Sequence, residues 1–176
     1  MTQPTSAVVD FEGVYRAHVR YVWRVLLRLG VRRADLEDVC QEVFTVVHRK
    51  LPEFEGRSAL RTWVHSIAYR AASEYRRRPW VRREESATER FEEPDPELPI
   101  EALELRERRR ILEQILEQLD DDRRAVFVLY ELEGLPMNEV VTIVDCPLQT
   151  GYSRLRSARE LVKLAVARRQ RKELSA

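Results

Sequence analysis

The stretch Gly134–Lys163, GLPMNEVVTIVDCPLQTGYSRLRSARELVK, decides the fold, because its pattern predicts two helices joined by a tight corner. The first helix is indicated by four apolar residues at helical spacing: Met137, Val140, Val141 and Val144. The corner is indicated by a run that breaks the pattern: Asp145, Cys146 and Pro147. A proline disfavours helix at the residue before it, yet it can open a new helix itself. The second helix is therefore expected from Leu148 onward.

The second helix of this pair has an apolar and a polar side. The apolar stripe is expected to face inward: Leu155, Ala158, Leu161, Val162 and Ala165. The polar side carries Gln149, Tyr152, Ser153, Arg156, Arg159 and Lys163. Such side chains suit base edges and phosphates, and two helices crossing at a short turn form a helix-turn-helix, whose second helix enters the major groove. An ordinary helical hairpin with a solvated basic face fits the same segment.

The composition favours an all-α protein. Only 5 of the 176 residues are Gly, 44% are hydrophobic, and no strand-like alternation stands out. No apolar run reaches the roughly 18 residues of a membrane span, and the first residues do not resemble a signal peptide. We therefore expect a cytoplasmic protein with no membrane insertion. Cys40 and Cys146 lack further Cys or His at ligand spacing, which predicts free thiols, no metal and no other cofactor.

The net charge of +1 hides a segregation of charge along the chain. Residues 1–78 hold 14 Lys and Arg against 9 Asp and Glu, residues 79–104 hold 3 against 9, and residues 105–176 hold 14 against 12. Two basic modules joined by an acidic spacer follow from these counts. Because the spacer is rich in proline and lacks helical periodicity, we expect a flexible linker over 79–104, between domains at 10–78 and 105–168.

Three amphipathic helices are predicted in the first module. The first covers residues 11–30 and the second residues 35–51. The third begins near Leu60, with Ser58 as a candidate N-cap. The second helix has a polar outer face: Asp35, Asp38, Gln41, Glu42, Thr45 and Arg49. The helix dipole accounts for its acidic start, and a solvated face is the plain explanation of the rest.

The third helix is predicted to turn a basic and aromatic face outward: Arg61, His65, Tyr69, Arg70, Ser73, Arg76 and Arg77. Arginine beside aromatic rings suits a phosphate backbone and unpaired bases, which stack on aromatic or guanidinium planes. A basic, solvated helix end is the alternative.

The second module opens with an apolar stripe over residues 111–119. Asp120 is placed to cap the next helix, which is apolar nearly all round over residues 125–132 and is therefore expected at the centre of the module. A basic tail follows the helix-turn-helix and is expected to be a fraying helix end: Arg168, Arg169, Arg171 and Lys172.

Taken in order, these motifs resemble bacterial RNA polymerase sigma factors of the extracytoplasmic-function (ECF) group of the sigma-70 family. The resemblance rests on DLEDVCQEVF at 35–44, FEGRSALRTWVHSIAYRAASEYRRR at 54–78, the acidic linker and the helix-turn-helix. It covers roughly residues 10–78 and 105–165. It implies two small helical domains, sigma region 2 and sigma region 4, in a transcription initiation factor that recognises the −10 and −35 promoter elements.

The resemblance implies a partner for each polar face. RNA polymerase core would dock on the second helix at Asp35, Asp38, Gln41, Glu42 and Thr45. The −10 element would be opened and held by Phe54, Gly56, Arg57, Ser58, Arg61, His65, Tyr69, Arg70, Ser73, Arg76 and Arg77. The −35 element would be read by Gln149, Thr150, Tyr152, Ser153, Arg156, Ser157, Arg159 and Lys163. An anti-sigma factor is implied as a further partner.

Within the recognition helix, we expect Arg156 and its polar neighbours to contact bases, and Arg159 and Lys163 to contact phosphates. Arg154 falls near the apolar flank, which predicts a structural ion pair with Glu139. Gly151 departs from the family pattern. It is expected either to weaken the helix by roughly 0.5–1 kcal/mol relative to Ala or to let the backbone approach DNA more closely.

No catalytic chemistry is expected, because the sequence shows no nucleophile beside a base, no paired-carboxylate site and no phosphate-binding Gly loop. The nearest rival function is a free-standing helix-turn-helix regulator that binds operators without polymerase. It would leave the polar face of residues 35–49 without a purpose. A helical adaptor that binds only protein is a second rival, and it predicts no salt-dependent affinity for DNA.

Overall fold

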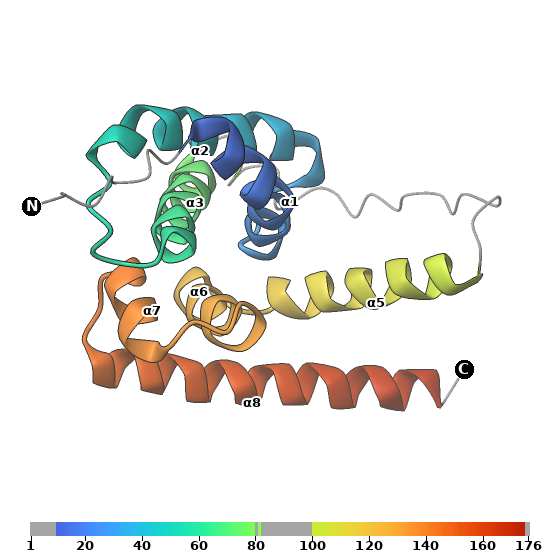
Figure 1. Ribbon diagram of the computed structural model, residues 1–176. Coiled ribbons are helices and arrows are strands. Elements are labelled where there is room, and N and C mark those ends of the chain that lie inside the picture. Colours follow the sequence, from blue (N-terminus) through green and yellow to red (C-terminus); the bar gives the residue numbers. More distant parts are fainter. Residues whose placement is uncertain (1–9, 80, 82–99, 175–176) are drawn as a thin grey trace, which may run out of the picture.

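The computed structural model describes residues 10–79, 81 and 100–174, which form two layers of helices (Figure 1). The upper layer, here the N-terminal module, contains α1 (Phe11–Arg28), η1 (Arg33–Asp35), α2 (Leu36–Lys50), η2 (Leu51–Glu53) and α3 (Leu60–Arg77). The lower layer, here the C-terminal module, contains α5 (Ile100–Glu117), α6 (Asp121–Phe127), the π-helical η3 (Val128–Leu132), α7 (Met137–Val144) and α8 (Leu148–Glu173). No β-strand occurs among the described residues, and the predicted all-α class is confirmed.

Local signals in the sequence set several helix ends. Asp10 caps α1 by accepting a hydrogen bond from the Gly13 N–H at 3.1 Å, and Asp120 caps α6 by accepting one from the Arg123 N–H at 3.0 Å. Gly30 terminates helix α1, because its φ of +92° is not helical and is a conformation that glycine adopts without steric cost. Asp145 turns the corner between α7 and α8 with a left-handed φ of +53°.

Two boundary expectations differ from the structure. The N-cap position of α3 is Ala59, and the Ser58 hydroxyl donates to the Ala59 carbonyl at 3.4 Å instead of capping the helix. The helix α5 begins at Ile100, so residues 100–104 of the expected linker are helical. Residues 82–99, the greater part of that linker, lie outside the described residues.

Buried apolar side chains join the helices within each module. In the N-terminal module, Val22, Val25, Val39, Val43 and Val64 have no exposed surface and lie between α1, α2 and α3. In the C-terminal module the centre is formed by Ala125, Val126, Val128, Val140 and Ala158, which confirms the predicted central position of α6. Each fully buried Val contributes about 1.5–3 kcal/mol. The buried residues of both modules form one continuous cluster.

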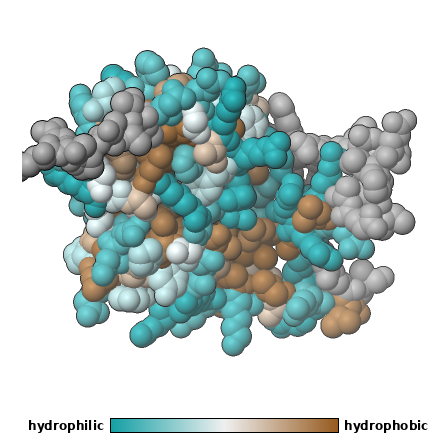
Figure 2. Space-filling view, in the orientation of Figure 1, coloured by the Kyte–Doolittle hydropathy of each residue, from teal (hydrophilic) through white to brown (hydrophobic). Residues whose placement is uncertain are grey.

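The helix α8 extends beyond the elements that cover it. Leu155, Ala158 and Ala165 are buried as the apolar stripe predicts, and Val162 is half-buried, but Leu161 is 37% exposed. Leu164, outside the predicted stripe, is 51% exposed. The covering helix α6 spans only seven residues against the 26 of α8, so it cannot cover the whole stripe. Apolar side chains therefore gather at the surface near α5 and α8 (Figure 2).

The predicted basic tail after residue 165 belongs largely to this helix, because α8 continues to Glu173. Arg169 donates to Glu107 of α5 at 2.9 Å, which holds the end of α8 beside α5. None of the described helices is both long enough and apolar enough to span a bilayer.

Candidate nucleic-acid and polymerase interfaces

The outer face of α8 is open to solvent. Gln149, Tyr152, Ser153, Arg156 and Lys163 are exposed, and Tyr152 shows 49% of its surface. Thr150 and Ser157 are half-buried at the edges of this face. The predicted polar side of the helix is therefore correct, and its side chains are of the kinds that hydrogen-bond to base edges and phosphates in a major groove.

Gly151 holds the start of α8 against α7. A Cβ atom at this position would lie 2.5 Å from Val141 Cγ1 and 3.0 Å from Met137 Sδ. Gly151 is buried, so it points away from the exposed face. The expectation that it lets the backbone approach DNA is wrong, because the close approach is to α7.

Arg154 forms a structural ion pair, as predicted, but with a different partner. Its guanidinium donates to Asp122 at the start of α6. Glu139, the expected partner, instead accepts a hydrogen bond from the Thr62 hydroxyl of α3 at 2.6 Å. A helical wheel of α8 shows which side Arg154 occupies, but it cannot show that α6, rather than α7, supplies the acidic partner on that side.

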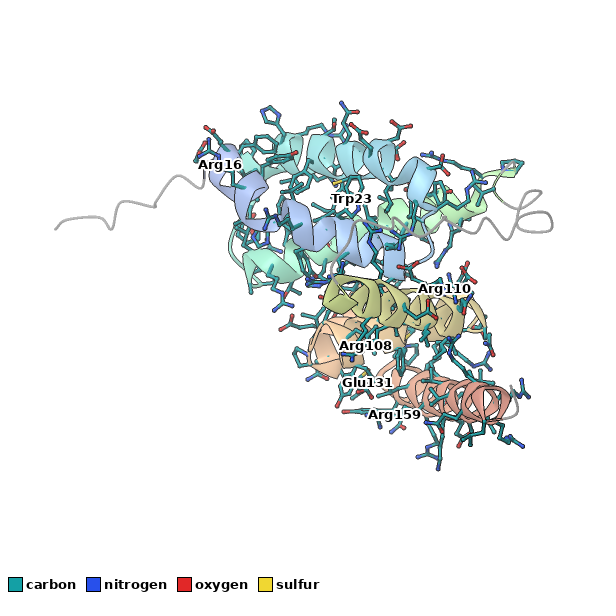
Figure 3. All side chains as sticks on the ribbon, turned by 90° about the vertical axis from the view of Figure 1, so that its right-hand side faces the viewer. Arg16, Trp23, Arg108, Arg110, Glu131 and Arg159 are labelled. Carbon is teal, nitrogen blue, oxygen red and sulfur yellow. The ribbon has the colours of Figure 1, made fainter. Side chains whose placement is uncertain are left out.

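Two further side chains of the recognition face have partners within the C-terminal module. Arg159 Nε donates to Glu131 Oε1 at 2.5 Å, and its guanidinium lies 5.8 Å from the centre of the Tyr130 ring (Figure 3). Ser157 accepts a hydrogen bond from Arg123 Nε at 3.0 Å. Beside them a hollow of about 410 Å³ is lined partly by Asp120 and Asp122. Each of these carboxylates is paired with an arginine, Asp120 with Arg123 and Asp122 with Arg154, so the basic face ends on the α6 side at ion pairs.

The face of α3 is less open than the sequence predicts. Arg61, Arg70 and Arg77 are exposed and Tyr69 and Ser73 are half-buried, but His65 has no exposed surface and Arg76 only 7%. The outward orientation expected for His65 and Arg76 is therefore wrong. The physical reason is that both modules cover this side of α3: Arg76 Nη1 lies 3.2 Å from Asp121 Oδ1 of the C-terminal module and donates to the Leu29 carbonyl, at the end of α1, at 2.5 Å.

His65 lies in a closed environment between the modules. Its Nδ1 is 2.9 Å from the Arg61 carbonyl oxygen, which can only accept, so Nδ1 carries the proton. The imidazole stacks edge-on against Tyr21 with ring centres 4.4 Å apart. Burial lowers the pKa of His65, and the hydrogen bond to Arg61 and the charge of Glu133 only partly oppose that shift.

The loop before α3 forms a hollow at the end of the N-terminal module. This hollow, of about 300 Å³, is lined by Glu53, Phe54, Glu55, Arg57, Ser58 and Trp63. The Phe54 and Trp63 rings have centres 5.0 Å apart, and Gly56 allows the turn with a φ of +69°. Trp63 is half-buried in this wall and also packs against the core of the module. An aromatic hollow with one arginine is suited to an unstacked base.

The outer face of α2 is exposed at Asp38, Gln41, Glu42 and Thr45. The Thr45 hydroxyl donates back to the Gln41 carbonyl at 2.8 Å, and Glu42 accepts from Arg78 at 2.8 Å. The polar side chains of this face therefore point away from the core of the N-terminal module.

Asp35 is half-buried beside that face and is held within the module. It accepts from the Tyr75 hydroxyl at 2.6 Å and from Arg32 Nε at 2.9 Å. Burial and the hydrogen bond to Asp35 raise the pKa of Tyr75 to about 12. The role of Asp35 that the contacts support is to join the start of α2 to α3.

The described residues contain no cluster of three His, Cys, Asp or Glu side chains that could hold a metal ion. Cys40 is buried and Cys146 half-buried, and both are free thiols. Burial raises the pKa of Cys40, which lowers its thiolate fraction and its reactivity.

Comparison with known proteins matches both modules in order. The family model described as Sigma-70 region 2 matches residues 14–82, and the one described as Sigma-70 region 4 matches residues 109–162. The ECF RNA polymerase sigma-E factor of Escherichia coli is 35% identical over 158 residues, which cover 82% of this chain and 81% of the relative. The sigma-E factor of Haemophilus influenzae is 33% identical over 150 residues, or 78% of each chain.

Two solved structures share the fold. CnrH, solved in complex with the cytosolic domain of CnrY, has a TM-score of 0.64 at 20% identity and covers 89% of this chain and 87% of its own. The sigma factor RpoE of Bartonella quintana, solved with the anti-sigma factor NepR, has a TM-score of 0.67 at 19% identity, with 90% and 97% covered.

Fold and matches together define a two-domain initiation factor of the sigma-70 type. The chain belongs to the ECF group of RNA polymerase sigma factors. The predicted family and function are thereby confirmed: the chain is a DNA-binding transcription initiation factor.

Proposed function

We propose that this ECF sigma factor binds polymerase core through the exposed face of α2 and reads its promoter through two separate faces. The main support for the proposal is the solvent-exposed polar side of α8. The opposite side of this helix packs closely against α7 at Gly151. Gln149, Tyr152, Ser153 and Arg156 contact base edges, while Arg159 and Lys163 contact phosphates.

The N-terminal module takes the −10 element in this proposal. An unpaired base enters the hollow between Phe54 and Trp63, beside Arg57. The exposed arginines of α3, Arg70 and Arg77, neutralise the phosphates of the melted strand. Functional domains at 10–78 and 105–168 follow from this division of labour.

The same proposal covers partners, location and chemistry. An anti-sigma factor binds the chain and holds it inactive. In support, RpoE of Bartonella quintana was solved in complex with the anti-sigma factor NepR, and CnrH in complex with the cytosolic domain of CnrY. The protein works in the cytoplasm, where polymerase and promoter are. It acts by binding alone, without catalytic chemistry of its own.

Run-off transcription with purified core polymerase on a promoter library tests the proposal. We expect transcripts from a subset of promoters sharing a −10 and a −35 sequence. Removing the Arg156 side chain should shift that preference, whereas Arg106→Ala, an exposed arginine of α5, should not. Binding to DNA without any polymerase-dependent transcript would contradict the proposal and favour a free-standing regulator.

A further inference from the structure

One hydroxyl on the recognition face has its hydrogen bonding set by a neighbouring helix. Ser157 lies on α8 about one turn after Ser153, and both serines line the hollow of about 410 Å³ beside α6. Arg123 of α6 donates from Nε to Ser157 Oγ at 3.0 Å. A guanidinium has donors but no acceptor, so the direction of this hydrogen bond is fixed. The Ser157 oxygen is therefore the acceptor.

Arg123 is itself held at two points by Asp120. The carboxylate oxygen Oδ1 accepts from the Arg123 backbone N–H at 3.0 Å, and the other oxygen, Oδ2, accepts from Arg123 Nη1. The backbone bond is the N-cap of α6, so the side-chain bond starts from a fixed point of the fold. Because the guanidinium is already paired with a carboxylate, it has little net charge to offer a phosphate. Its contact with Ser157 is better suited to orienting the hydroxyl.

The hydroxyl proton of Ser157 has no acceptor within the described part of the chain. A hydroxyl carries one proton and two lone pairs, and the proton turns away from a donor that occupies one of the lone pairs. Other helical hydroxyls donate to the carbonyl four residues earlier, as Thr45 does to Gln41 and Thr142 to Asn138, both at 2.8 Å. Ser157 instead accepts from another helix. Its proton is thus left for a ligand on the recognition face.

We propose that Arg123 is a positioning residue for base reading: it fixes Ser157 as a hydrogen-bond donor, and Ser157 then disfavours cytosine. In the major groove guanine presents N7 and O6, adenine N7 and thymine O4 as acceptors, whereas cytosine presents only the N4 amino donor. A fixed donor gains a hydrogen bond from the first three bases and faces a like donor on cytosine. The inference rests on the proposed reading of the −35 element by α8 and adds the chemistry that one position selects.

Ser153 provides an internal comparison on the same helix. It is exposed, and among the described residues no side chain donates to its hydroxyl. Such a hydroxyl rotates to donate or to accept, so it pairs with acceptor and donor edges alike. Ser153 should therefore tolerate cytosine where Ser157 does not. The difference between the two serines comes from α6 and not from α8.

The test uses the full chain bound to purified polymerase core and a library of duplex promoters randomised at the −35 element. Sequencing of the bound fraction gives the preference at each base pair. Ser157→Ala identifies the base pair that Ser157 contacts, because the preference changes there. At that position we expect the wild type to bind sites with cytosine facing Ser157 about fivefold more weakly than sites with an acceptor there, the effect of one hydrogen bond.

Arg123→Met removes the donor to Ser157 and keeps a long side chain. It also keeps the backbone N–H through which Asp120 caps α6, so the helix retains its cap. Once released, the Ser157 hydroxyl can rotate and accept from cytosine. We expect the discrimination against cytosine to fall from about fivefold to about twofold or less.

Arg110→Met is the matched control. Arg110 of α5, labelled in Figure 3, pairs with Glu107 three residues earlier, as Arg123 pairs with Asp120. Its substitution removes the same charge and the same kind of ion pair, and it should leave the −35 preference unchanged. Loss of charge alone weakens all sequences alike, whereas release of Ser157 changes the ranking of bases at one position.

A double variant separates positioning from direct contact. In the Ser157→Ala background, Arg123→Met should change the base preference no further, because the hydroxyl that Arg123 orients is gone. A further change would mean that Arg123 itself contacts a base, and it would overturn the inference. An Arg123→Met protein with the wild-type discrimination would overturn it too, as would a Ser157→Ala protein with the wild-type preference at every position.

The wild-type complex separates these failures from failure of the proposed function. A wild type with no preference anywhere in the −35 element would remove the proposed function itself. A wild-type preference that stays the same in Ser157→Ala and in Arg123→Met would remove the positioning role alone.

Discussion

The two helices proposed to face DNA, α3 and α8, differ in what covers them. The polar side of α8 faces solvent at Tyr152, Ser153 and Arg156, whereas α3 has His65 and Arg76 buried against the C-terminal module. Both helices are amphipathic and basic, so the difference does not come from their own sequences. It comes from what packs against α3. Acidic groups of the C-terminal module, Glu133 and Asp121, lie on one side, and α1 adds the Tyr21 ring and the Leu29 carbonyl. The free chain therefore exposes the face proposed to read duplex DNA, on α8, and covers part of the face proposed to hold single strand, on α3.

The largest expected effect is on the packing of α8 against α7 at Gly151. Gly151→Val places a branched side chain where Val141 and Met137 already lie, so we expect a loss of about 2–3 kcal/mol in the free energy of unfolding. Urea denaturation measures this loss. Ser153→Val, on the exposed side of α8, should change stability by no more than about 0.5 kcal/mol. Equal stabilities of the two variants would show that α7 does not fix the orientation of α8.

Base reading by the open face is tested by Arg156→Ala. We expect a loss of about 1–3 kcal/mol in discrimination at one base pair of the −35 element, with little change at others. Binding to a library of duplex sites measures the preference at each position. A uniform weakening across all sequences would instead mean that Arg156 contacts only phosphate.

The sequence predicts a helix end or face well when the residues that determine it are close in the chain, and poorly when they are distant. Asp10, Gly30 and Asp120 determine helix ends only a few residues away. The helices that begin or end at these residues were predicted correctly. The polar side of α8 also follows from periodicity alone. His65 and Arg76 were misplaced because their contacts are distant in the sequence. Tyr21 and Leu29 belong to α1 and its end, and Glu133 and Asp121 lie in the other module, so helical periodicity within α3 cannot reveal them.

The same distinction explains the misassigned partners. Arg154 was predicted to form an ion pair from its place on the wheel, but Asp122 rather than Glu139 is the partner, because relative helix positions are not encoded locally. Glu133 was not singled out at all. A lone glutamate before a glycine gives no sign in the sequence that four basic or ionisable side chains of α1 and α3 will surround it.

The next effect is expected for Asp120, the N-cap of α6. Asp120→Ala should cost about 1 kcal/mol in the free energy of unfolding, because it removes the N-cap of α6. Although burial raises the pKa of Asp120, its hydrogen bonds with Arg123 outweigh burial and lower the pKa below the ordinary 3.8.

The sign of the pH effect follows from that lowered pKa. The charged carboxylate contributes stability above about pH 3.8, and this contribution is lost as the pH falls through the lowered pKa. Asp120→Asn, which can still cap, should lose this part of the pH dependence but keep most of the stability at neutral pH. Acid denaturation of the two proteins measures the difference. A mutant and wild type with the same acid dependence would show that Asp120 caps without its charge.

The smallest expected effect separates phosphate contact from base contact on the same helix. Arg159→Ala should weaken binding to all duplex sequences alike and reduce the slope of log affinity against log salt by about 1. Because Arg159 already pairs with Glu131, part of its charge is neutralised in the free chain, and the reduction should not exceed one contact. A change in sequence preference would reverse the roles assigned to Arg156 and Arg159.

Arginine modification by phenylglyoxal, followed by mass spectrometry, tests the contrast between the two faces most directly. In the free chain we predict fast modification of Arg156 on α8 and of Arg70 on α3, and slow modification of Arg76, whose side chain is only 5% exposed. In a promoter complex with polymerase core, Arg156 should become protected. Equal rates for Arg70 and Arg76 in the free chain, or an Arg156 that stays reactive on the promoter, would contradict the account.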